Sequence, residues 1–103
     1  MKVGDYVRTK FGEIGKLENI GEYNINIKIG KHIQVIAKTE DYKSSPNIID
    51  LIEVGDYVNG YLVVGIVDSK IITNSLILTF SEENIKTVIT KEQFSQMEYK
   101  VGE

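Results

Sequence analysis

Few side chains of this sequence could carry out chemistry. The chain has no cysteine and one histidine, His32, so cysteine nucleophiles and thiolate zinc sites are excluded. A metal site around His32 would need carboxylates for all its other ligands. Asp5 and Asp56 each follow a glycine where a strand is expected to begin, a place where aspartate often caps turn amides. We therefore expect His32 to be an exposed turn residue, both aspartates to be structural, and the chain to have neither metal nor cofactor.

Two catalytic sequence patterns are also missing. Ser44-Ser45-Pro46 lacks the flanking glycines of a nucleophile elbow. Gly12-x-x-Gly15-Lys16 lacks the spacing and the hydroxyl residue of a phosphate-binding loop. The sequence therefore predicts a protein that binds and does not catalyse, with no catalytic residues.

Basic residues alternate with aromatic ones in the first half of the chain. Side chains of these two kinds can contact phosphates and stack on bases, although a solvated strand around a core phenylalanine would give the same pattern. Those we select as candidate partner-binding residues are Arg8, Lys10, Phe11, Lys16 and Tyr23.

The second half of the chain is acidic. Residues 1–52 carry a net charge of +1 and residues 53–103 a net charge of −4. Glu82 and Glu83 follow Phe80 and predict an acidic turn, which is either solvated or faces a basic partner. Tyr61 has no exact counterpart in the first half, and tyrosine is favoured where proteins bind one another. Tyr61, Glu82 and Glu83 complete the candidate partner-binding residues.

The apolar residues favour β structure. Isoleucine and valine dominate them, and Ala37 is the only alanine. β-Branched side chains suit strands better than helices, and nine glycines against one proline indicate many tight turns. The length of 103 residues suits one compact domain or two very small ones. The chain has no apolar run long enough to span a membrane, and its first five residues lack the apolar stretch of a signal peptide. We expect a cytoplasmic protein that does not contact the membrane.

An internal repeat divides the chain. Residues 3–7, Val-Gly-Asp-Tyr-Val, recur identically as residues 54–58, an offset of 51. Ile14-Gly15 matches Val64-Gly65 at an offset of 50, and weaker matches from Ile33 onward follow at 52. The repeat predicts two domains, 1–52 and 53–103.

Alternation and turn residues predict five short strands in the first half and six in the second. The predicted strands are 5–9, 14–20, 23–29, 33–37 and 48–49, then 57–62, 63–68, 70–73, 76–80 and 85–89, with a last strand at 99–101. A helical turn is expected at 39–42, capped by Thr39, and a short helix at 90–94, where Thr90 and Gln93 have capping-box spacing. This plan predicts an all-β protein of two tandem SH3-like small β-barrels, each with one short helical turn before its last strand. One continuous β-sandwich or meander is the alternative.

Two resemblances follow from these residues. Gly4-Asp5-Tyr6-Val7 followed by Gly12–Leu17 resembles the opening of KOW and related SH3-like modules, and the second half lacks a basic residue at the place of Lys16. Most of the chain, above all residues 45–58 and 90–94, is similar to small phage and prophage proteins of AT-rich Gram-positive bacteria.

These observations predict a protein-binding module of phage or mobile-element origin. Its partner would be a host or phage protein. The sharpest form is an anti-defence inhibitor, such as an anti-CRISPR, whose acidic half would block the nucleic-acid channel of a host protein. The alternatives are nucleic-acid binding by the KOW-like first repeat, and a structural phage protein that oligomerises through strand edges.

Overall fold

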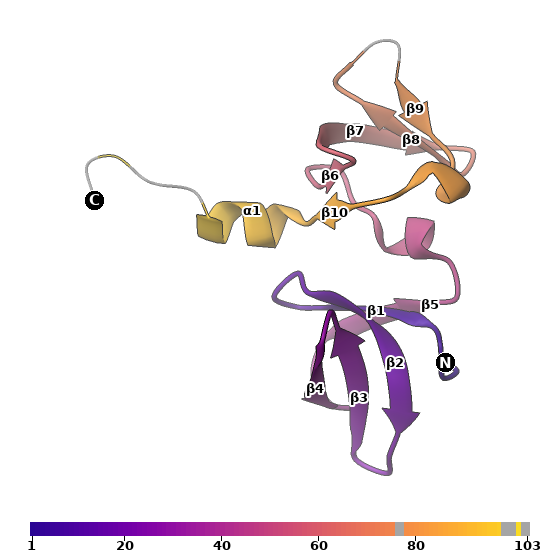
Figure 1. The fold of residues 1–103 in the computed structure, drawn as a ribbon, viewed down its shortest axis with the longest axis vertical. Helices are drawn as coiled ribbons and strands as arrows, with labels where there is room; N and C mark the ends of the chain where they lie inside the picture. Colours follow the sequence, from indigo (N-terminus) through magenta and orange to yellow (C-terminus); the bar gives the residue numbers. More distant parts are fainter. Residues whose placement is uncertain (76–77, 98–100, 102–103) are drawn as a thin grey trace. The chain divides into compact units, whose positions relative to one another are not determined.

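The computed structural model describes residues 1–75, 78–97 and 101, which form mainly β structure in two compact units, Met1–Leu51 and Ile52–Glu103 (Figure 1). We call them unit 1 and unit 2. Each contains one five-stranded antiparallel sheet and one 3-10 turn. The mainly β class that the sequence predicts is therefore confirmed. In the described part of the chain, no helix is long and apolar enough to cross a membrane.

Unit 1 is a meander of four strands whose fifth strand returns beside the first. Its elements are β1 (Tyr6–Thr9), β2 (Ile14–Ile20), β3 (Asn24–Ile29), β4 (His32–Ala37), β5 (Tyr42–Ser45) and the 3-10 turn η1 (Ile48–Leu51). The strand order across the sheet is β4-β3-β2-β1-β5, so β4 and β5 are the edge strands.

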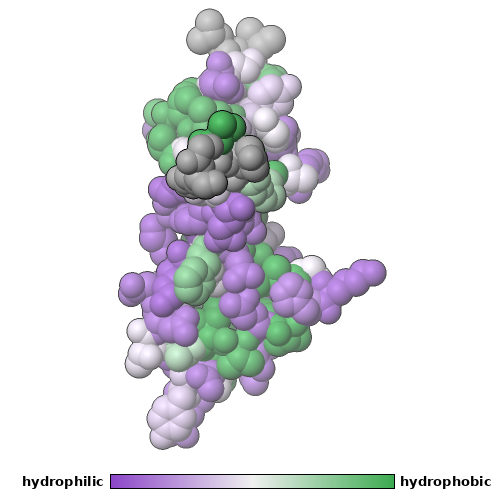
Figure 2. Space-filling model, turned by 90° about the vertical axis from the view of Figure 1, so that its left-hand side faces the viewer, coloured by the Kyte–Doolittle hydropathy of each residue, from purple (hydrophilic) through white to green (hydrophobic). Residues whose placement is uncertain are grey.

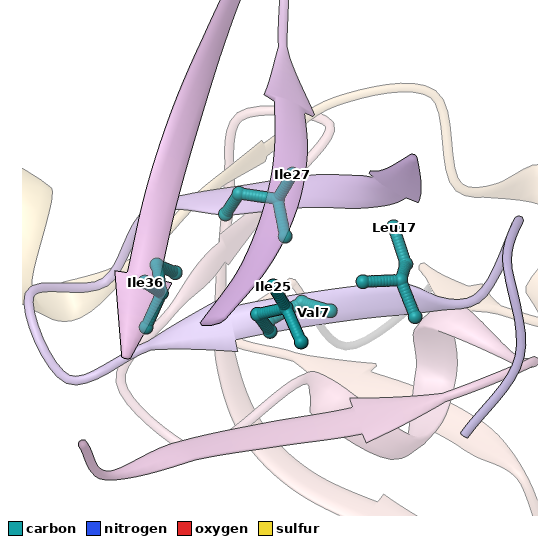
Figure 3. Close-up of a cluster of buried hydrophobic side chains, with 5 residues drawn as sticks. All are labelled: Val7, Leu17, Ile25, Ile27 and Ile36. Atoms are coloured by element: carbon teal, nitrogen blue, oxygen red, sulfur yellow. The ribbon is translucent and has the colours of Figure 1, made fainter. Parts of the chain in front are cut away.

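The core of unit 1 gathers on one face of this sheet. Figure 3 shows its five buried side chains, which come from β1, β2, β3 and β4: Val7, Leu17, Ile25, Ile27 and Ile36. Ile25 lies directly opposite Ile36, and Leu17 lies opposite Ile27. Full burial of one such side chain stabilises a fold by about 1.5–3 kcal/mol, so these pairs fix which face of the sheet is inside.

Unit 2 repeats the arrangement with shorter strands. Its elements are β6 (Tyr57–Val58), β7 (Tyr61–Val67), β8 (Lys70–Thr73), β9 (Thr79–Phe80), the 3-10 turn η2 (Glu82–Asn84), β10 (Val88–Ile89) and α1 (Lys91–Met97). Its strand order is β10-β6-β7-β8-β9. As in unit 1, the fifth strand lies beside the first, and the fourth strand forms the other edge. Val58, Val63 and Ile71 are buried in its interior. Neither sheet closes on itself within the described strands.

The repeated pentapeptide folds in the same way in both units. Gly4 and Gly55 have φ angles of 96° and 100°, which favour glycine. The Asp5 carboxylate accepts a hydrogen bond from the backbone amide three residues earlier at 2.9 Å, and that of Asp56 does the same at 2.8 Å. Both aspartates therefore hold a turn, as the sequence predicts.

Beyond the pentapeptide, the predicted alignment of the repeats is wrong. Val7 faces Gly15 across β1 and β2, but Val58 faces Tyr61 across β6 and β7. The offset thus falls from 51 to 46, because the turn after β6 is shorter than the turn after β1. Gly15 corresponds to Tyr61 and not to Gly65. The β-bulges in β2 and β7 lie at the same offset of 46.

In unit 1, the predicted order of the last two elements is also wrong. Residues 39–42 form no helical turn, because Tyr42 begins β5, which pairs with the free edge of β1. The Tyr42 side chain packs against the core. Residues 48–49 form no strand. Pro46 lacks the amide that a ladder needs, and Ser45 Oγ instead accepts from the Asn47 amide at 3.1 Å and donates to Asp50 at 2.7 Å. The 3-10 turn of unit 1 therefore follows its last strand.

In unit 2, the helix predicted after the strand at 85–89 is present as α1, which follows β10, and the 3-10 turn η2 lies before β10. The capping box of α1 is confirmed: the Thr90 amide donates to Gln93 Oε1 at 3.2 Å, and the Gln93 amide donates to Thr90 Oγ1 at 3.3 Å. The strand predicted at 57–62 is interrupted by a turn at Asn59 and Gly60. The strand predicted at 99–101 falls largely outside the described residues.

The first residue of α1 is tied to the repeated turn of unit 2. The Lys91 amide donates to Asp56 Oδ1 at 2.9 Å, and Lys91 Nζ forms a 2.7 Å salt bridge with Glu53 Oε1. The hydrogen bond and charge of Glu53 raise the pKa of Lys91 above its ordinary value. These contacts fix where the helix begins, at the end of β10.

Candidate functional site

The structure places Arg8 inside unit 1. This residue is only 3% exposed, and its guanidinium donates to the backbone carbonyl of Leu51 at 2.9 Å. A buried guanidinium needs acceptors within the protein, and the carbonyl at the end of η1 is one of them. Arg8 therefore holds η1 against β1 and is not available to a partner, contrary to our selection of it.

The other two basic candidates of unit 1, Lys10 and Lys16, each lie beside a different aromatic ring. Lys10 Nζ lies 5.2 Å from the ring centre of Phe11 in the turn after β1, and Lys16 Nζ lies 5.2 Å from that of Tyr6. Tyr6 and Lys10 are four positions apart along the chain, on the order of 13 Å in an extended strand. Phe11 is 54% exposed and is not a core residue.

Tyr23 lies beside the end of β4. Its side chain is 75% exposed, and its backbone carbonyl accepts a hydrogen bond from the Lys38 amide at 2.9 Å. Among the aromatic candidates, Tyr23 is the one with the most open surface, at the point where β3 and β4 part.

The candidates of unit 2 lie around η2 and β7. The ring centres of Tyr61 and Phe80 are 6.1 Å apart. Glu82 is half-buried, and Glu83 is exposed at the surface of η2. The backbone amide of Glu83 and the Ser81 hydroxyl lower the pKa of the Glu83 carboxyl, so this residue stays charged at neutral pH. The acidic turn thus exists and is partly stabilised by its own backbone.

A pair of lysines lies on the outer face of unit 1. Lys16 and Lys28 are directly opposed across β2 and β3, and both are exposed. Like charges in this relation destabilise a sheet unless an anion or water separates them. The cross-strand row continues to Tyr6 on one side and to Ile33 on the other.

The outer edge of unit 1 is an apolar strand. Ile33 and Val35 of β4 are 50% and 61% exposed, whereas Ile36, on the opposite face of the same strand, faces the core and is buried. Figure 2 looks from the side on which Figure 1 draws β4 and shows hydrophobic side chains interrupting the hydrophilic surface. We call the side chains of Ile33 and Val35, with their outward backbone groups, the β4 edge.

The hydrogen-bond pattern of β3 and β4 shows which backbone groups point outward. The Lys38 amide bonds the Tyr23 carbonyl, and bonded pairs alternate along an antiparallel ladder. By this alternation, Gln34 and Ile36 bond to β3, and the N–H and C=O groups of Ile33 and Val35 point away from it. No described residue bonds to those four groups. They are available to another strand.

β4 is the longest edge strand in the described structure. β4 has six residues, whereas the edge strands β5, β9 and β10 have four, two and two. Edge strands are commonly guarded by lysine, proline or a bulge, and β4 contains none of these between His32 and Ala37. An apolar unguarded edge of this length is a surface to which a strand can be added.

The corresponding outer face of unit 2 is aromatic and apolar. The rings of Tyr57 and Phe94 stack with their centres 4.7 Å apart, and Tyr57 lies opposite Leu62 and Ile89 across the sheet. Leu62 stands where Lys16 stands in unit 1. The two units therefore present different chemistry on equivalent faces.

Sequence reasoning missed Lys28, Ile33 and Val35. It placed Ile33, Val35 and Ala37 together on one face of a strand but did not identify that face as exposed. The signal was Ile36, which breaks the alternation and marks the opposite face as the one facing the core. Lys28 could not be found without the register of β2 and β3.

Comparisons of the chain with protein families, curated proteins and solved structures find no match.

Proposed function

We propose that the chain is a non-enzymatic protein-binding module, in which unit 1 receives an extended segment of its partner as an additional strand beside β4. The β4 edge carries this proposal, because the side chains and the unbonded backbone groups of Ile33 and Val35 reach the surface together. In strand addition, main-chain hydrogen bonds supply affinity and alternate side chains supply specificity. Both components are present at the β4 edge.

We also infer that each unit is a small SH3-like barrel. The support is the strand order, in which the fifth strand lies beside the first in both units. In unit 2, the 3-10 turn between the fourth and fifth strands adds to it. An experimental structure in which each sheet curls around its interior while the β4 edge stays unpaired would support this inference, and a flat sheet would contradict it.

The sharper role that the sequence predicts is inhibition of a host nucleic-acid-binding protein by steric occlusion. Strand addition at β4 would anchor unit 1 on such a partner, and the net charge of −4 on residues 53–103 would compete for its basic surface. This role depends on the protein-binding proposal and is a narrower form of it.

Nucleic-acid binding is the second candidate, and the Lys16–Lys28 pair favours it. Two directly opposed exposed lysines, of which Lys16 lies beside the ring of Tyr6, could contact a phosphodiester backbone. Two observations make it the weaker candidate. Arg8 is engaged within unit 1, and Lys10 lies in the distant turn after β1.

The test of the proposal is a selection of random short peptides on the immobilised full chain. We expect selected peptides to have apolar residues at alternate positions, and to bind the variant Ile33→Lys/Val35→Lys at least about tenfold more weakly, because lysine guards an edge against pairing. Val54→Lys is the matched control, since Val54 is 57% exposed but lies outside β4. We expect it to bind as the wild type does.

A parallel titration with a short single-stranded RNA and a DNA duplex separates the two candidates. Binding of either nucleic acid at low salt that Lys28→Glu abolishes, together with no peptide that depends on β4, would contradict the protein-binding proposal and support the second candidate.

A further inference from the structure

We infer that the segment received at the β4 edge is an acid-flanked apolar strand of a different protein. This inference rests on the proposed function and names the chemistry of its partner. The segment would have two apolar residues at alternate positions, opposite Ile33 and Val35, and an acidic residue toward each end.

The charges around the β4 edge carry the inference. Lys31 precedes β4, Lys38 follows it, and Lys28 lies directly opposite Ile33 on the same face. All three lysines are exposed, and none forms an ion pair with a described residue. The sequence has no acidic residue between Lys28 and Lys38; those that flank this stretch are Glu22, before β3, and Glu40 and Asp41, after β4.

The geometry sets the spacing of the acidic residues. Lys31 and Lys38 are seven positions apart, which is on the order of 23 Å in an extended strand. A partner strand with apolar residues opposite Ile33 and Val35 would therefore place its acidic residues near Lys31 and Lys38, provided that the acidic residues stood two or three positions beyond the apolar pair. Lys28, one strand further in, would reach the same face.

A second copy of this chain fits the β4 edge less well. A symmetric antiparallel pair that opposes Ile33 and Val35 of the two copies would place Lys31 opposite Ala37 of the other copy, next to its Lys38. Such like-charge contacts would occur at both ends of the pair and oppose it. The same lysines attract a segment with carboxylates at those places.

The test uses two synthetic peptides with blocked termini, Glu-Thr-Val-Thr-Val-Thr-Glu and Lys-Thr-Val-Thr-Val-Thr-Lys, titrated into the full chain labelled with ¹⁵N. The backbone amide resonances of Ile33 and Val35 report binding at the edge, and those of unit 2 report the fold. We expect the acidic peptide to bind about threefold to tenfold more tightly, as two exposed ion pairs allow, and the difference to shrink at high salt. We expect Lys31→Glu/Lys38→Glu to reverse the preference.

The outcomes separate the inference from the proposed function. Equal affinities for the two peptides, or a preference that Lys31→Glu/Lys38→Glu leaves unchanged, would overturn the inference and leave strand addition standing. If neither peptide shifts the amides of Ile33 and Val35, both are overturned. A dimer in sedimentation equilibrium that Val35→Lys dissociates would make a second copy the occupant and would also overturn the inference.

Discussion

Single residues in this protein often hold two elements together, and Asn59 is the clearest case. Asn59 and Gly60 have φ angles of 52° and 86° and form the turn between β6 and β7. Asparagine and glycine are the residues that tolerate such angles in a hairpin turn. The Asn59 side chain also donates to the Asn84 carbonyl at 2.8 Å and accepts from the amides of Lys86 and Thr87 at 2.8 and 3.0 Å. It thereby ties the turn to the segment that leads into β10.

We expect Asn59→Ala to lower the free energy of unfolding by roughly 2–3 kcal/mol, because it removes three hydrogen bonds and replaces asparagine, which tolerates a left-handed conformation, by alanine, which tolerates it less well. Asn59→Gly is the control that separates these causes. It keeps the turn geometry and loses the hydrogen bonds, so we expect a smaller loss. Urea unfolding followed by circular dichroism measures both, and an Asn59→Ala protein as stable as the wild type would show that these bonds contribute nothing.

At the scale of the elements, β3 approaches β2 so closely at Gly15 that a side chain there would have no room. A β-carbon on Gly15 would lie 2.6 Å from the Lys28 carbonyl oxygen and 2.8 Å from Ile29 Cγ1. β2 and β3 could not keep their spacing around it. Gly65 in β7, which the sequence alignment paired with Gly15, has only ordinary contacts, the nearest being Ile72 Cβ at 3.8 Å.

We expect Gly15→Ala to destabilise unit 1 by about 2 kcal/mol or more, in the range that overpacking costs, and Gly65→Ala to change stability by much less. Thermal unfolding of the two variants against the wild type measures the difference. Equal effects would mean that the two glycines are equivalent after all, and that the strand register does not distinguish them.

At the scale of the whole molecule, one strand plan is used twice with different surfaces. Val35 on the edge of unit 1 corresponds to Thr79 in unit 2, because the two residues face Asn26 and Ile72 at equivalent positions of the ladders. At this described position, unit 2 therefore has a polar residue where the edge of unit 1 has an apolar one. Each unit retains its own buried residues, and Ile25 and Ile71 occupy the same place in the two interiors.

We expect Ile25→Ala and Ile71→Ala each to cost about 2–5 kcal/mol, the usual range for a buried isoleucine. Because each side chain belongs to the interior of one unit, amide hydrogen exchange should accelerate in the unit that carries the substitution. Exchange that accelerates equally in both units for both variants would show that the chain opens as one cooperative body.

Elements whose formation depends on neighbouring residues could be predicted, because alternation and turn residues act locally. The strands 14–20 and 70–73 and the capping box of Thr90 and Gln93 were predicted as the structure has them. The prediction of a helical turn at 39–42 was wrong, because pairing of β5 with the free edge of β1 stabilises the chain more than a helix cap at Thr39 would. The same edge explains why Arg8 is buried under η1 rather than exposed on a strand.

Residue types and local patterns were enough to establish mainly β structure in two similar halves, because β-branched residues, glycine turns and a repeated pentapeptide act within a few positions of one another. The register between strands, and with it the Lys16–Lys28 pair, the burial of Arg8 and the open edge at Ile33 and Val35, was decided only by the fold. Pairing joins residues that lie far apart in the chain. Its outcome depends on which faces meet in a common interior, and no single segment carries that information.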